Sequence, residues 1–195
     1  MGELIGLVGF SIVCTVTPGP NNVLLWASGA TFGFLRTLPH VLGTAFGVGF
    51  LALAVAAGIG ALIETVPGLA VAMRLVGSVY LLYLAYRIAT AGALHRGSAA
   101  RPLTVLQAAA FQVSNPKVWV FALSAITTFR PPELPVAAGC LVVIATMMVV
   151  AVPTSAVWAA GGGTLARFVA DDRRRVAVSW LLGGLVALTV VSVWV

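Results

Sequence analysis

The sequence predicts an all-α integral membrane protein, and three observations carry that prediction. Of the 195 residues, 61% are hydrophobic and 8% are charged, and the mean hydropathy is +1.09. A soluble domain carries about 25% charged residues, so this chain has too few charges to cover a surface exposed to water. The apolar stretches are continuous and rich in Leu, Ala, Val and Gly, without the period-two alternation of β-strands. Helices surrounded by lipid are therefore expected.

Six membrane-spanning helices in one domain, residues 1–195, are expected from the length of the chain. A membrane helix uses about 20 apolar residues, and the apolar stretches run over 4–30, 41–63, 69–91, 104–128, 135–159 and 176–194. Charge, Gly and Pro mark the loops between them, at 31–40, 64–68, 92–103, 129–134 and 161–175. The first stretch follows an acid, Glu3, with no basic residue before it, so we expect it to be retained rather than removed as a signal peptide.

Arginine predicts the orientation of these helices. Basic residues accumulate on the cytoplasmic side of a membrane protein. The first, third and fifth loops and the adjoining helix ends carry eight of them, Arg36, Arg87, Arg96, Arg101, Arg167, Arg173, Arg174 and Arg175. The opposite side carries Arg130, beside Glu3, Glu64 and Glu133. Both termini are therefore expected outside the cell. The segment from Asp171 to Arg175 is expected to anchor the topology and to contact anionic lipid rather than nucleic acid.

The first apolar stretch is expected to break near its middle, at Pro18, Gly19 and Pro20. Proline has no N–H and clashes with the carbonyl four residues earlier, so the carbonyls of Cys14 and Val16 lose their helical donors. Unpaired backbone inside a membrane is tolerated where it lines a polar cavity. Four polar side chains flank the break, those of Thr15, Thr17, Asn21 and Asn22, which favours a binding site over an ordinary kink.

A second break is expected in the fourth stretch at Pro116, which frees the carbonyl of Gln112 and lies beside Ser114, Asn115 and Lys117. Interrupted helices at matching positions in two halves are typical of an inverted-repeat transporter. The halves would be about 1–91 and 104–195, and three helices in each half make them face opposite ways. We therefore expect a 3+3 repeat whose two breaks meet near the bilayer midplane.

The residues at the breaks suit a zwitterion. Helix N-termini attract anions, so the half-helices that begin at Asn21 and Lys117, with the Lys117 charge, suit a carboxylate, and the freed carbonyls suit an ammonium group. A charge in mid-helix costs at least about 2.5–3.5 kcal/mol to insert, which makes Lys117 a functional candidate. The expected substrate-binding residues are Thr15, Thr17, Pro18, Gly19, Pro20, Asn21, Asn22, Gln112, Ser114, Asn115, Pro116 and Lys117.

Separated motifs resemble one known family. They are Thr17 to Asn22, Gly29, Gly33, Leu38 to His40, Gly43, Gly77 to Arg87, and Phe111 to Lys117. Together they look like the signature of the lysine exporter and homoserine/threonine-resistance family, and they are most similar to its cysteine and O-acetylserine exporter branch. The resemblance implies a six-helix bacterial inner-membrane exporter of a small amino acid or a derivative, not an enzyme. Several branches carry an acid where this chain has Val48, Gly49 and Phe50, so a neutral or small polar substrate fits better than a dibasic one.

Proton coupling is what the family resemblance implies, with uncoupled export as the alternative. Intramembrane Asp, Glu and His commonly carry protons, but every acid falls in a terminus, a loop or a span's edge. His40, expected to cap a helix at the interface, and His95 fall in loops, which leaves Lys117 as the expected proton carrier. Arg74 is near enough to the end of its span to reach the headgroups.

Three other function classes remain as weaker alternatives. A thiol/disulfide electron carrier needs a cysteine pair, but Cys14 and Cys140 are far apart in the sequence, and a metal exporter needs clustered ligands that this chain does not show. A non-transporting membrane interaction protein is the third. The sequence indicates no metal and no cofactor, and its many Gly and Ala residues allow the close contacts of a homodimer.

Overall fold

The computed structural model describes residues 2–58, 68–91, 101–168 and 172–191, and all of its regular structure is helical. The helices in chain order are α1 (Gly2–Val16), α2 (Pro20–Phe32), α3 (Phe34–Ala56), α5 (Leu69–Ala91), α6 (Val105–Val113), α7 (Pro116–Phe129), α8 (Val136–Phe168) and α9 (Asp172–Leu188). Two of the expected loops lie partly outside the described residues, namely 64–67 of the loop at 64–68 and 92–100 of the loop at 92–103. Glu64, His95 and Arg96 are therefore outside the described residues.

Both expected breaks are present, and several expected spans have the observed bounds. Helices α1 and α2 together correspond to 4–30, and they are bent by 62° at the break. Helices α6 and α7 correspond to 104–128, and α5 coincides with 69–91.

The expected loop at 31–40 is wrong. Helix α2 continues to Phe32 and α3 begins at Phe34, so Gly33 alone separates them. Gly33 has φ of +83°, a conformation that glycine adopts without a Cβ penalty, and one residue is enough for the turn. Pro39 lies inside α3, where it removes a single helical hydrogen bond near the start of the helix. His40 is therefore a buried residue of α3 and not an interfacial cap.

The expected loop at 161–175 is also mostly helix. Helix α8 runs on to Phe168 and α9 begins at Asp172. The glycines at 161–163 suggested a loop, but they allow α8 to lie directly against α2. A Cβ added at Gly162 would overlap the backbone of Trp26, and one added at Gly29 would overlap the backbone of Ala159. Backbone contact between two helices, rather than a turn, explains these glycines.

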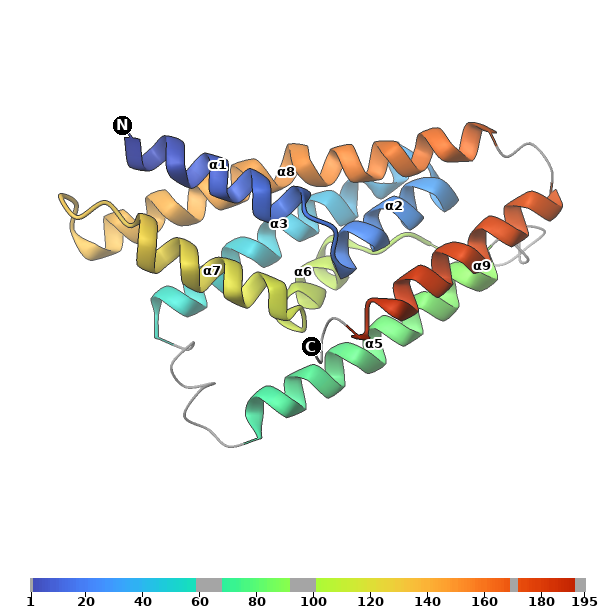
Figure 1. The fold of residues 1–195 in the computed structure, drawn as a ribbon, viewed down its shortest axis with the longest axis horizontal. Coiled ribbons are helices and arrows are strands. Elements are labelled where there is room, and N and C mark those ends of the chain that lie inside the picture. The colour runs from blue at the N-terminus through green and yellow to red at the C-terminus, as the bar shows by residue number, and fades with distance from the viewer. Residues whose placement is uncertain (1, 59–67, 92–100, 169–171, 192–195) are drawn as a thin grey trace.

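The buried apolar side chains form two main cores, and the helices of the two cores also pack on each other, α2 on α8 and α3 on α6 (Figure 1). One apolar core joins α1, α3, α7 and α8, with Leu51, Phe121 and Met147 among its buried members. The other joins α2, α5, α6 and α9, with Leu81, Phe111 and Leu182 among its members. Helices α5 and α9 lie side by side along their length, and α8 packs on α1, α2 and α3. Each broken helix thus contributes one half to each core.

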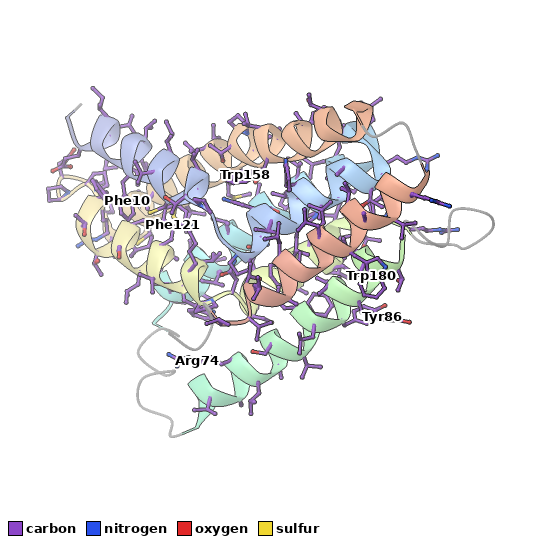
Figure 2. The ribbon with its side chains drawn as sticks, turned by 45° about the vertical axis from the view of Figure 1, so that its right-hand side comes forward. Phe10, Arg74, Tyr86, Phe121, Trp158 and Trp180 are labelled. Atoms are coloured by element: carbon purple, nitrogen blue, oxygen red, sulfur yellow. The ribbon has the colours of Figure 1, made fainter. Side chains whose placement is uncertain are left out.

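The outer surface of the helices is apolar. Among the described residues, α3 (Phe34–Ala56) and Val136–Thr164 of α8 are each long and apolar enough to cross a membrane. The bent pair of α1 and α2 adds a third such span if it is counted as one. Tyr86 on α5 is 66% exposed and Trp180 on α9 is 57% exposed, and both project from the outside of that helix pair (Figure 2). Such side chains favour a lipid environment over water.

Candidate functional site

The first break, called break 1 here, is the segment Thr17–Gly19 between α1 and α2. Asn22, in the first turn of α2, donates from Nδ2 to the carbonyl of Thr15 at 2.7 Å and to the carbonyl of Thr17 at 2.9 Å. An asparagine amide has two N–H donors, and both are used here. A side chain of the second half-helix therefore satisfies carbonyls at the end of the first.

The N-terminus of α2 keeps free donors. Pro20 has no N–H, the Val23 N–H bonds to the carbonyl of Gly19, and the N-cap Gly19 offers no side-chain acceptor. Among the described residues, none accepts a hydrogen bond from the backbone N–H of Asn21 or Asn22. Unpaired N–H groups at a helix N-terminus carry a partial positive charge and bind anions.

The second break, called break 2, is Ser114–Asn115 between α6 and α7, and it is closed. Asn115 caps α7, because its Oδ1 accepts from the Lys117 N–H at 3.2 Å and its carbonyl accepts from the Val118 N–H at 3.0 Å. The carbonyl of Gln112, expected to be free for an ammonium group, accepts from the Asn115 N–H at 3.1 Å. The Trp119 indole donates to the carbonyl of Val113 at 2.8 Å. Break 2 therefore satisfies its own backbone.

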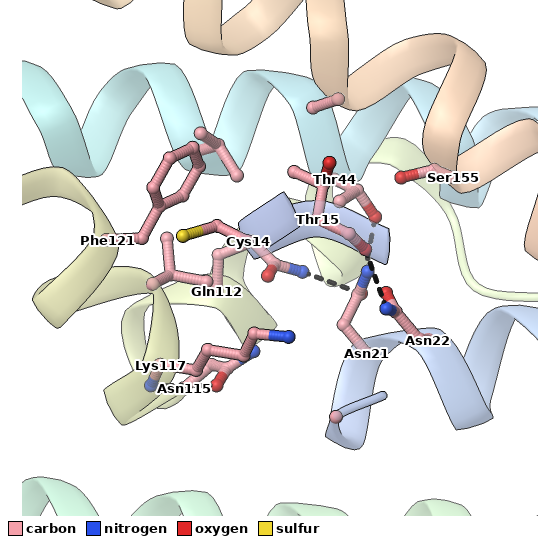
Figure 3. Close-up of a pocket in the computed structure, with 14 residues that line it drawn as sticks. Cys14, Thr15, Asn21, Asn22, Thr44, Gln112, Asn115, Lys117, Phe121 and Ser155 are labelled. Carbon is pink, nitrogen blue, oxygen red and sulfur yellow. Dashed lines mark hydrogen bonds between the residues drawn. The ribbon is translucent and has the colours of Figure 1, made fainter. Parts of the chain in front are cut away.

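The two breaks touch, as the sequence predicted. Lys117, from the start of α7, donates from Nζ to the carbonyl of Thr17 in break 1. Its side chain lies over Gly19, where an added Cβ would be 3.2 Å from Lys117 Cδ. The charge of Lys117 thus stands at the free N-terminus of α2 (Figure 3).

Two cavities meet at this point. The smaller, called the site cavity, has a volume of about 40 Å³, room for about three water molecules. The larger, called the outer cavity, has a volume of about 530 Å³. Five residues line both cavities and form the boundary between them, Cys14, Gly19, Asn115, Lys117 and Phe121.

Ten of the twelve expected residues line these cavities. Thr15, Gly19, Asn21, Asn22, Gln112, Asn115 and Lys117 line the site cavity, and Pro18, Pro20 and Pro116 line the outer cavity. Thr17 and Ser114 line neither. Thr17 contributes its carbonyl to Lys117 and Asn22, and Ser114 packs against Gly77 of α5.

The sequence reasoning missed residues that other helices bring to the site cavity. Thr44 comes from α3, Ser155 from α8, and Phe121 from α7. Pro153 lies two residues before Ser155 inside α8, and it could have indicated a polar site there. The sequence was instead interpreted as an ordinary proline kink. Thr44 had no local signal, because it is one polar residue within an apolar helix.

Asn21 is the centre of a buried polar network. Its Oδ1 accepts from Gln112 Nε2 at 2.9 Å and from Thr44 Oγ1 at 3.3 Å, and it lies 3.4 Å from His40 Nε2. All four residues are less than a tenth exposed. The network therefore holds the first turn of α2 against both α3 and α6.

Arg74 of α5 lines the outer cavity together with Lys117, and its side chain is exposed. These are the two charged residues among those that line the outer and site cavities. An anionic group approaching from the outer cavity therefore meets two positive charges in succession.

Comparison with known proteins adds a family and several relatives. A model of the LysE type translocator family matches residues 12–193. The cysteine/O-acetylserine efflux proteins of Escherichia coli strain K12 and of Shigella flexneri are each 28% identical to this chain over 125 residues. The match covers 64% of this chain and 64% of each relative, so less than two thirds of the relatives' length is matched. No solved structure matches the chain significantly.

Proposed function

Because the chain belongs to the LysE type translocator family, we propose that it exports a small amino acid or amino-acid derivative, and that it is not an enzyme. The observation that carries this proposal is the pair of free N–H groups of Asn21 and Asn22 beside the Lys117 ammonium group. The helix N-terminus presents a partial positive charge and Lys117 presents a full one. Together these three donors suit the binding of a carboxylate.

The ammonium group of the substrate is bound by neutral oxygens in this proposal. Thr44 Oγ1 and Ser155 Oγ line the site cavity, and no described residue that lines it is a carboxylate. A single ammonium group can be satisfied by hydroxyl and carbonyl oxygens, but a second one would lack a counter-charge. The lining therefore supports a neutral or small polar substrate over a dibasic one.

The substrate would extend across the boundary between the two cavities. The site cavity is too small for a whole amino acid, while the outer cavity has the volume of an ordinary ligand pocket. We place the carboxylate and ammonium groups at the site cavity and the side chain toward Phe121 and the outer cavity. The relatives' names, cysteine/O-acetylserine efflux protein, support a short polar side chain.

The membrane arrangement we propose has six spans in two inverted three-helix halves, in the bacterial inner membrane, with both termini outside. One end of the molecule holds the junction of α2 and α3 together with the C-terminal ends of α5 and α8 (Figure 1). Arg36, Arg101 and Arg173 belong to segments at that end, which would face the cytoplasm. In this arrangement lipid surrounds the helices, and a homodimer remains a prediction. We also propose that export is coupled to protons.

The test is counterflow in proteoliposomes that contain the purified protein. Vesicles are loaded with unlabelled cysteine, O-acetylserine, serine, threonine or lysine, and uptake of the same labelled compound is measured. We expect exchange of at least one neutral amino acid and none of lysine. Lysine exchange as fast as that of every neutral compound would contradict the proposed substrate class, and no exchange of any compound would contradict the exporter.

A further inference from the structure

His40 lines a cavity separate from the site cavity, and it contacts Asn21, which lines the site cavity. The ring is fully buried, and one nitrogen, Nε2, is 3.4 Å from Asn21 Oδ1. The other nitrogen, Nδ1, is buried without a hydrogen-bond partner among the described residues. A buried polar atom without a partner is costly and calls for an explanation.

The separate cavity, called the His40 cavity, has a volume of about 30 Å³, room for about two water molecules. His40 and Ser28 line it, together with Leu84 and Ile88 of α5 and Arg101. Phe32, the last residue of α2, also lines it, so this cavity lies toward the junction of α2 and α3. The imidazole therefore connects the polar network of the candidate substrate site to a second small cavity.

The side chains that form the network around the imidazole are neutral. They are Asn21 of α2, Thr44 of α3 and Gln112 of α6. Arg101 is the one charged residue among those described that line the His40 cavity. Histidine is the side chain that changes its charge most readily near neutral pH.

Lys117 is less suited to that role. Its ammonium group donates to the carbonyl of Thr17 and stands where the substrate carboxylate is placed. The proposed carboxylate contact needs the charged form, so a proton leaving Lys117 would weaken the binding of the substrate that export depends on.

We propose that His40, rather than Lys117, is the proton-binding group that couples export to the proton gradient, an inference that rests on the proposed exporter function. In the neutral ring Nε2–H donates to Asn21 Oδ1 and Nδ1 holds a lone pair. A hydronium ion from the outer side transfers its proton to Nδ1 and leaves water. The imidazolium later returns that proton to a water in the His40 cavity. One proton enters for each substrate molecule that leaves.

Protonation changes what the network can do. In the imidazolium both ring nitrogens are donors, and Nδ1–H has no acceptor among the described residues around it. The charged ring must therefore gain a partner by moving or by admitting water. Either change alters the hold of His40 on Asn21, and through Asn21 the first turn of α2 at the site cavity.

The first experiment compares His40→Gln with Ser28→Ala in proteoliposomes. Both side chains line the His40 cavity, but only the first variant removes a titratable group, and Ser28 lies outside the proposed substrate site. The measured quantity is export under an inward proton gradient divided by export without a gradient. For one coupled proton the stimulation is at most about tenfold per pH unit. We expect the ratio to fall to one in His40→Gln and to stay at the wild-type value in Ser28→Ala.

The outcomes separate the two proposals. Absence of counterflow in the wild type contradicts the exporter itself. Counterflow in the wild type with no response to the gradient, or a response that His40→Gln keeps, overturns the role of His40 while the exporter stands. A loss of the response in both variants equally would show that packing at the His40 cavity, not the proton, matters, and would also overturn it.

A second measurement does not depend on the folding of His40→Gln. The chain has two histidines, so His95→Gln leaves His40 as the only one. The protein is labelled with ¹⁵N-histidine, and the ring nitrogen shifts are followed between pH 5 and 9 with and without cysteine. We expect the ring to gain a proton within this range, at a pH that substrate shifts. A ring that stays neutral throughout, or titrates identically with and without substrate, overturns the proposal.

Discussion

Break 1 and break 2 differ in what happens to the N–H groups of the helix that follows. Proline and asparagine lie within or next to each break, and each break interrupts a predicted span. At break 2 the asparagine precedes the proline, so Asn115 becomes the N-cap of α7 and accepts from the Lys117 N–H. At break 1 the asparagines follow the prolines, so Asn22 reaches back to the carbonyls of Thr15 and Thr17. The same residue type satisfies donors at one break and acceptors at the other.

This difference shows which half-helix has N–H groups free to bind an anion. The sequence suggested both N-termini for the substrate carboxylate, but at the start of α7 the N–H groups of Lys117 and Val118 have acceptors. The free N–H groups belong to α2, and break 2 contributes the Lys117 side chain instead. Two related breaks thus supply unlike parts of one site, and the following predictions test that division from the largest expected effect to the smallest.

Removing the charge that break 2 contributes should have the largest effect. Lys117→Met deletes a charged donor worth about 1.5–3 kcal/mol, which corresponds to about a 10- to 150-fold loss of counterflow. Lys117→Arg keeps the charge and should retain more activity. Insertion and folding are checked by gel filtration in detergent. Counterflow at the wild-type rate in Lys117→Met would make Lys117 a structural link only.

The two asparagines should differ in their contribution to stability. Asn22→Ala leaves the carbonyl of Thr15 without its side-chain donor, while Lys117 still donates to that of Thr17; we expect a cost of about 1–3 kcal/mol for the unsatisfied group if water does not replace the donor. Asn115→Ala removes one N-cap, at about 1 kcal/mol. Unfolding in detergent micelles by heat or denaturant measures both. Equal losses of stability in the two variants would contradict the prediction that Asn22 stabilises break 1 more than Asn115 stabilises break 2.

A methyl group at break 1 should disturb Lys117 slightly. In Gly19→Ala the added Cβ lies 3.2 Å from Lys117 Cδ, so the lysine side chain must shift by a few tenths of an ångström. We expect about a threefold rise in KM, equivalent to about 0.7 kcal/mol. Gly9→Ala, where an added Cβ meets nothing within 4 Å, is the matched control in α1. The same rise in KM in both variants would contradict the contact.

The smallest effect is expected at Arg74, which is exposed and lines the outer cavity. Arg74→Gln should lower the rate of substrate entry by about twofold at low salt, because a long-range charge attracts the carboxylate. At about 1 M salt the Debye length falls to about 3 Å, and the difference from the wild type should vanish. An effect that is independent of salt would indicate direct contact between Arg74 and the substrate.

Much of the fold followed from local chemistry. Continuous apolar stretches predicted the helices, and α5 has the predicted bounds. Pro18, Pro20 and Pro116 predicted both breaks, because a missing N–H interrupts a helix wherever it lies. The polar residues beside those prolines were a correct guide to the cavities, since backbone and side chains near a break lie close together by covalent connection.

What the sequence could not determine depends on contacts between distant residues. Glycines that marked loops at 161–163 lie inside α8, because the backbone of α2 packs against them. His40, assigned to a loop, is buried beside Asn21 because Gly33 alone makes the turn between α2 and α3. Gln112 reaches Asn21 across 91 positions, and Lys117 reaches Thr17 across 100. Only the packing of the two halves decides which N–H groups remain free, because a donor is free when no acceptor from elsewhere in the chain reaches it.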